Sequence, residues 1–180
     1  GGLTSVEALL AEIAPRLGHG NEEVRGAAAE AVAGVAAPLR ARSLEAGNSG
    51  DELLASAVRL LVPLAGDGEE DVRWAALRAL GRVAPRAEGP ALEAVKRCAA
   101  TGDDEERLAA IEALSQMAAK GDRAVLALLR DCLGRGGDVQ KAALRSLVDM
   151  YSPEDASKIM EEMAMDVGDG EPDVGLGAAR

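Results

Sequence analysis

Apolar residues recur along the chain at helical spacing, in stretches that short polar turns separate. The first stretch follows a capping box at residues 4–7, Thr-Ser-Val-Glu, in which Thr4 would be the N-cap, and it continues to Leu17. The turn 18–21, Gly-His-Gly-Asn, ends this stretch, and Asn21 can cap a second one that begins near Val24. The pattern predicts two antiparallel helices joined by a short turn, and similar pairs follow along the chain.

A six-residue motif marks the start of the second helix in each pair. Its first copy reads Glu-Val-Arg-Gly-Ala-Ala and its second Asp-Val-Arg-Trp-Ala-Ala. The copies are residues 23–28, 71–76, 105–110, 138–143 and 173–178. The positions equivalent to Val24 are 24, 72, 106, 139 and 174, which lie 48, 34, 33 and 35 residues apart. A period of this size indicates one helical unit stacked on copies of itself.

The repeat predicts one all-α domain over residues 1–180. Pro15 and Pro63 occupy matching places in the first helices of two pairs, and each should kink its helix or end it early. The expected repeats cover about 4–37, 51–85, 90–120 and 122–151, with a partial repeat at 153–180.

Between the first two repeats, the longest irregular stretch is expected from about Pro38 to Gly50. It would explain the single step of 48 residues. We interpret this stretch, about 38–50, as a surface insertion. The alternative is a contact loop that carries Arg40 and Arg42 on an otherwise acidic chain.

The last repeat is incomplete. Its turn, 168–174, nearly copies the turn 66–72, but Arg180 falls inside the expected second helix. Either the protein continues beyond this sequence, or the last repeat is a degenerate cap that Gly175 and Gly177 weaken.

The sequence is acidic and poor in aromatic residues. It has a net charge of −11, no Phe, and a single Trp and Tyr, at Trp74 and Tyr151. Ala, Leu and Val must therefore supply nearly all of the buried surface. The charge argues against non-specific nucleic-acid binding and against docking on anionic lipid, and no apolar stretch suits a membrane span. We expect an intracellular protein, soluble or bound in a complex, of unassigned compartment.

Few residues offer reactive chemistry. Cys98 and Cys132 each fall near the end of an apolar helical stretch, which predicts buried free thiols, with a disulfide or a reactive thiol as the alternative. His19 is the single histidine, so no zinc or iron site is indicated. The segment 134–137, Gly-Arg-Gly-Gly, lacks the Lys-Ser/Thr of a phosphate loop and reads as a turn. We predict no catalytic residue, cofactor or metal.

The paired helices, the period, the proline in the first helix and the Asp-Val-Arg-x-Ala-Ala motif together resemble the HEAT-repeat family. The resemblance is closest to the short, Ala-rich type that is also seen in phycobilisome-lyase-like repeats. It implies a right-handed α-solenoid of stacked antiparallel helix pairs, whose second, or B, helices line a concave surface. It also implies a ladder of acid–arginine pairs between repeats, carried by Arg25, Arg73 and Arg107 and interrupted at Gln140 and Gly175.

On the B helices, residues spaced by four lie off the expected buried face. We expect them to form the floor of the concave surface. Trp74 replaces Gly, Leu and Lys of the other repeats, so either it fills a gap between repeats or it anchors an interface. The full row is Gly26, Glu30, Gly34, Trp74, Arg78, Arg82, Leu108, Glu112, Gln116, Lys141, Arg145 and Asp149. The candidate protein-binding residues in it are Trp74, Arg78, Arg82, Glu112, Gln116, Lys141, Arg145 and Asp149.

These features predict a non-enzymatic scaffold or assembly subunit that binds a helix or extended peptide of complementary charge along the B helices. A stable subunit inside a large complex fits the same features. The alternative from a different class is an enzyme or enzyme subunit resembling HEAT-type bilin lyases, which rests on fold-level analogy alone. A change of absorbance on mixing with a bilin pigment would separate the two classes.

Overall fold

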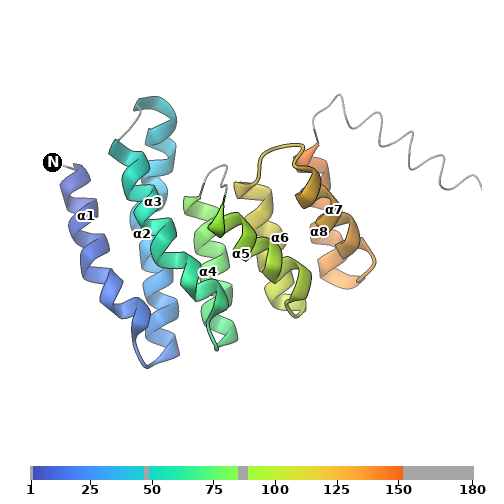
Figure 1. Cartoon of the computed structure of the whole chain (residues 1–180), viewed down its shortest axis with the longest axis horizontal. Helices are drawn as coiled ribbons and strands as arrows, with labels where there is room; N and C mark the ends of the chain where they lie inside the picture. The colour runs from blue at the N-terminus through green and yellow to red at the C-terminus, as the bar shows by residue number, and fades with distance from the viewer. Residues whose placement is uncertain (1, 47–48, 85–88, 152–180) are drawn as a thin grey trace, which may run out of the picture.

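The computed structural model describes residues 2–46, 49–84 and 89–151, with side chains placed except at 2–3 and 41–49. Within these ranges the regular structure is entirely helical. Figure 1 shows successive antiparallel helices lying side by side from the blue N-terminal end to the orange α8. The protein is therefore an all-α solenoid. Its elements are α1 (Gly2–Ile13), η1 (Ala14–Gly18), α2 (Glu22–Ala46), α3 (Ser49–Leu61), η2 (Val62–Gly66), α4 (Glu70–Val83), α5 (Pro90–Thr101), α6 (Asp104–Met117), α7 (Arg123–Leu133) and α8 (Gly137–Met150).

The helices form two layers. The A layer contains α1 with η1, α3 with η2, α5 and α7, and the B layer contains α2, α4, α6 and α8. Each B helix packs extensively on the next B helix, whereas successive A helices contact one another sparsely. The repeats are therefore held together mainly through contacts within the B layer.

Small residues allow the B helices to approach closely. A Cβ atom on Gly81 of α4 would lie 2.9 Å from the Cα of Ala113 on α6. Gly26 of α2 faces Ala75 of α4, whose Cβ would lie 4.0 Å from a Cβ built on the glycine. The core is built almost wholly from Ala, Leu and Val, as the shortage of aromatic residues predicts.

The two prolines act as predicted. α1 gives way at Ala14 to the 3₁₀ segment η1, which has Pro15 in its first turn. In the same way α3 gives way at Val62 to η2, with Pro63 in its first turn. A proline cannot donate the helical hydrogen bond and crowds the preceding turn, so α1 and α3 both change from α-helical to 3₁₀ geometry next to their proline.

Two predictions about helix ends are wrong. α1 begins at Gly2, so Thr4 lies inside the first turn and is not the N-cap. α2 continues through Pro38 to Ala46, so the expected irregular stretch is helical over 38–46. Pro38 and Gly34, four residues before it, are both exposed, so water can reach the carbonyl group that the proline leaves unpaired.

The extension of α2 also overturns the idea of a contact loop around Arg40. Arg40 is half-buried, and its Nη1 donates to the main-chain oxygens of Gly81, at 2.8 Å, and Arg82, at 3.3 Å. Its Nη2 donates to the main-chain oxygen of Gln116 at 2.7 Å. The extension therefore ties α2 to the C-terminal ends of α4 and α6. Arg42 lies in the same helix.

The expected partial repeat at 153–180 lies outside the described residues.

Candidate functional site

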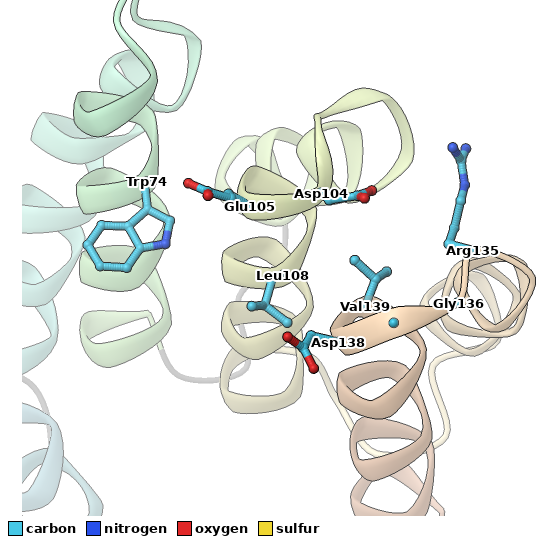
Figure 2. Close-up of a pocket in the computed structure, with 9 residues that line it drawn as sticks. Trp74, Asp104, Glu105, Leu108, Arg135, Gly136, Asp138 and Val139 are labelled. Carbon is cyan, nitrogen blue, oxygen red and sulfur yellow. The ribbon is translucent and has the colours of Figure 1, made fainter.

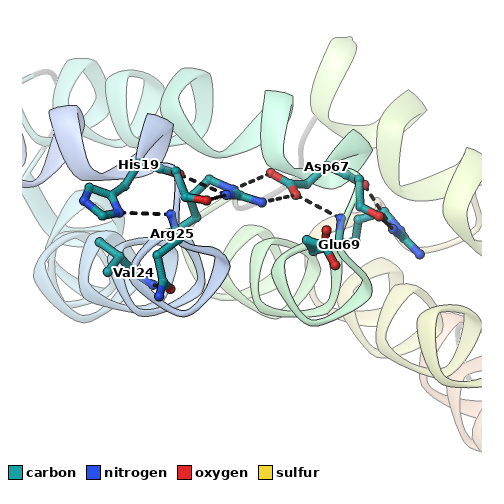
Figure 3. A network of polar contacts seen from close by, with 9 residues as sticks. His19, Val24, Arg25, Asp67 and Glu69 are labelled. Atoms are coloured by element: carbon teal, nitrogen blue, oxygen red, sulfur yellow. Dashed lines mark hydrogen bonds and ion pairs between the residues drawn. The ribbon is translucent and has the colours of Figure 1, made fainter.

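The first contact between repeats is an arginine–carboxylate fork (Figure 3). Arg25, near the start of α2, donates from Nε and Nη2 to the two carboxylate oxygens of Asp67, at 2.9 and 2.8 Å. Its Nη1 also donates to the main-chain oxygens of His19 and Gly20. The hydrogen bond from Arg25 lowers the pKa of Asp67 and raises the pKa of the guanidinium. A fork of this shape fixes the register of two neighbouring repeats.

A second contact of the same kind links the next two repeats. Arg73 donates from Nε to Oε2 of Glu106 at 3.2 Å, and from Nη1 to the main-chain oxygens of Asp67 and Gly68. Glu106 is buried. Asp67 therefore lies between the arginines of two repeats, and both hold the turn before α4.

Arg107 behaves differently from the other two arginines. It donates to the main-chain oxygens of Ala99 and Ala100 and to the carboxylate of Asp104, which all belong to its own repeat. The ladder between described repeats therefore ends before Gln140. The physical reason is the next repeat: its turn, 134–137, has no carboxylate, and Val139 stands where Glu106 accepts from Arg73.

All eight candidate binding residues are exposed on the B helices. Trp74 is 40% exposed. The guanidinium carbon of Arg78 lies 4.6 Å from the centroid of the Trp74 ring, one turn along α4. Arg78 also approaches Glu30 of α2, with 3.7 Å between Nη1 and Oε1. Trp74, Arg78 and Glu30 thus form a continuous surface across two B helices.

The other candidates are more dispersed. Arg82 and Gln116 keep exposed side chains while their main-chain oxygens accept from Arg40. Lys141 pairs with Asp138 at 3.0 Å on α8. Within the candidate set, the side chains of Trp74 and Arg78 stack on each other. The remaining candidates are Glu112, Arg145 and Asp149, each exposed on its helix.

A cavity of about 500 Å³ lies beside Trp74, between α4, α6 and α8. Figure 2 shows Trp74 on one side, residues of α6 in the middle and the start of α8 on the other side. Apolar contacts come from Trp74, Leu108 and Val139. The cavity is open to solvent, so a side chain of another molecule can enter it.

The rim of this cavity is acidic. Asp104 and Glu105 open α6, and Asp138 opens α8, with Arg135 as the single basic lining residue among those described. The pKa of nearby Glu70 is raised, first by the charge of Asp103 and then by burial and by Glu105, which indicates a crowded negative field. Sequence reasoning missed these acids as site residues because acids at the start of a helix also complement the helix dipole.

The described residues show little that suits other chemistry. They contain no group of three or more His, Cys, Asp or Glu side chains positioned to hold a metal ion. Cys98 and Cys132 are buried free thiols, as predicted, each near a main-chain oxygen of the preceding repeat. No helix in the described part of the chain is long and apolar enough to cross a membrane.

Comparison with known proteins identifies the repeat. No curated protein matches the chain. Among solved structures, an engineered protein crystallised by the Northeast Structural Genomics Consortium matches with 21% sequence identity, over 83% of this chain and 84% of that chain, with a TM-score of 0.45. The family model for HEAT repeats matches residues 10–115 of this chain. The chain therefore belongs to the HEAT-repeat family.

Proposed function

We propose that this protein is a non-enzymatic scaffold that binds a protein segment along its B helices, with Trp74 as the anchor. HEAT repeats generally serve as protein-interaction scaffolds. The observation that carries the proposal is the exposed indole of Trp74, which stands beside an open cavity and stacks with Arg78. Exposed Trp and Arg dominate the energetics of protein interfaces.

The lining of the cavity indicates the partner's chemistry. An apolar side chain of the partner would enter the cavity and contact Trp74 and Leu108. Lys or Arg side chains on either side of it would face Asp104, Glu105 and Asp138. A segment that combines basic and apolar residues would therefore complement this site, with the charges setting orientation and association rate.

A site-directed photo-crosslinking experiment tests the proposal. A photoreactive residue placed at Arg135, on the cavity rim, should capture a basic segment from an extract of the native source. The same residue at Arg97, exposed on α5 in the A layer, is the matched control. Trp74→Ala should reduce the capture at position 135 at least tenfold while leaving the helical circular dichroism unchanged.

A second set of variants tests whether the acidic rim of the cavity is needed for binding. Asp104→Asn with Glu105→Gln should weaken capture, whereas Glu22→Gln with Glu23→Gln, which changes the net charge equally on α2, should not. Equal capture from positions 135 and 97, or capture that survives loss of Trp74, would show that this cavity is not the working surface. A large drop in melting temperature in Trp74→Ala would mean instead that the indole fills a gap between repeats.

A further inference from the structure

The last described B helix leaves open a face that the earlier B helices bury. Leu144 and Val148, one turn apart on α8, are 47% and 75% exposed. The residues that correspond to Leu144 in the two preceding repeats, Leu77 of α4 and Ile111 of α6, are both 0% exposed. The residue of α4 that corresponds to Val148 is Gly81, which is buried against Ala113 of the next B helix. The open face of α8 is therefore the face on which a following repeat packs.

The sequence after α8 carries the start of such a repeat in register. The turn 168–174 differs from the turn 66–72 at one position, where Pro172 replaces Glu70. Glu70 is the first residue of α4, and proline is favoured at the first position of a helix. Val174 also follows Val139 by 35 residues, close to the steps of 34 and 33 that separate residues 72, 106 and 139.

The part of this segment that corresponds in sequence to the A helix α5 is apolar at the matching positions. Counted back from Val174, four apolar residues correspond to four buried residues of α5. Glu162 and Asp166 depart from the pattern, because they stand where Ala94 and Cys98 are buried. Docking of this segment should therefore be weaker than the packing between the inner repeats. The four matched pairs are Ile159 with Ala91, Met160 with Leu92, Met163 with Val95, and Val167 with Ala99.

We propose that residues 153–180 dock on the open face of α8 as a further repeat, with residues 172–180 covering Leu144. A segment of the same chain is favoured over a second copy for two reasons. The segment is tethered close to α8, which gives it an effective concentration on the order of millimolar. Two copies of a chain of net charge −11 repel each other. This proposal does not depend on the partner-binding proposal above.

A contact between two described repeats gives the Cβ–Cβ distance expected at the proposed contact. A Cβ on Gly26 of α2 would lie 4.0 Å from the Cβ of Ala75 on α4, which is within the range that a disulfide spans. The equivalent residues across the proposed contact are Lys141 and Gly177. The full chain carrying Lys141→Cys and Gly177→Cys should therefore form an intramolecular disulfide on mild oxidation.

Two further variants calibrate the experiment. Gly26→Cys with Ala75→Cys is the positive standard. Lys141→Cys with Gly175→Cys is the matched control, because it makes the same two kinds of substitution but moves one thiol to another side of the proposed helix. Cys98 and Cys132 stay in every variant, since both are buried. Mass spectrometry under non-reducing conditions identifies the linked peptides.

The expected result is crosslinking at least tenfold faster for 141 with 177 than for 141 with 175. Adding Leu144→Asp should slow the first reaction at least fivefold, because it places a charge on the covered face. Equal rates for the two pairs would mean that the segment does not dock in register and would overturn the proposal. Disulfide-linked dimers would overturn it too, since they would show that a second copy covers α8.

Discussion

Arg40 on α2 donates a hydrogen bond to the main-chain oxygen of Gln116 on α6, across 76 residues of sequence and at a distance of 2.7 Å. The same guanidinium reaches the main-chain oxygen of Gly81 on α4. The last carbonyl groups of a helix lack partners within the helix and carry the negative end of its dipole. One cation therefore satisfies the ends of two B helices and holds three repeats together.

Arg40→Ala should lower the free energy of unfolding by about 1–3 kcal/mol, since hydrogen bonds from a charged group are lost at two helix ends. Arg40→Lys should recover part of the loss, because a single ammonium cannot reproduce the planar fork. Urea denaturation measures both values. Arg123→Ala, at an exposed position on α7, is the control. An Arg40→Ala effect no larger than that of the control would contradict the role assigned to Arg40.

Gly81→Ala should destabilise the protein although alanine is the better helix former. The added Cβ would lie 2.9 Å from the Cα of Ala113, so α4 and α6 would have to separate, at a cost of about 1–3 kcal/mol. Gly34→Ala is the matched control, because nothing lies within 4 Å of the added Cβ at this exposed helical position. It should stabilise the protein by about 0.5–1 kcal/mol. Thermal unfolding of the two variants should therefore shift in opposite directions.

Asp67→Asn should change how stability depends on pH. The pKa of Asp67 is lowered in the folded protein, chiefly by the hydrogen bond from Arg25, relative to about 3.9 for an unfolded chain. Such a group contributes stability that is present above the unfolded pKa and is lost as the pH falls through the folded pKa. The difference in unfolding free energy between wild type and Asp67→Asn should be largest near neutral pH and should shrink below about pH 4.

Urea titrations at several pH values test this expectation. Asp71→Asn, which neutralises an exposed acid on α4, serves as the comparison. A difference between wild type and Asp67→Asn that stays constant from pH 7 to the acid region would mean that the Arg25–Asp67 pair contributes no pH-dependent stability.

Both thiols should be unreactive in the folded protein. Burial raises the pKa of Cys98 to about 12, with a further contribution from Glu106, and burial also raises the pKa of Cys132. At pH 8 the thiolate form is therefore scarce, and reagent access is blocked as well. Labelling with a thiol-specific disulfide reagent should be slow in buffer and complete in denaturant, with a rate that rises with urea concentration. Rapid labelling in buffer would contradict the burial of these side chains.

The order and type of the elements were predictable from the sequence, because local spacing and capping carry them. The prolines at 15 and 63 marked the ends of two A helices, and the recurring motif located the start of each B helix. Helix length was less predictable. Pro38 and the Gly- and Ser-rich segment after it suggested an irregular stretch, yet α2 continues to Ala46.

Part of the candidate site could also be predicted from the sequence. Trp74 could be singled out because the other repeats carry Gly, Leu or Lys at its position. The acids of the rim, Asp104, Glu105 and Asp138, could not, since an acid in the first turn of a helix has the same sequence signature whether it lines a cavity or only complements the dipole.

The sequence by itself determined that this protein is a stack of helix pairs, and it located the residues that repeat. The tertiary structure decided what those residues contact. Arg25 and Arg73 reach the next repeat whereas Arg107 stays within its own, and Arg40 spans three B helices. The physical reason is range: helix formation and capping depend on neighbours within a few residues, while these contacts depend on how closely, and at what offset, one helix packs on the next.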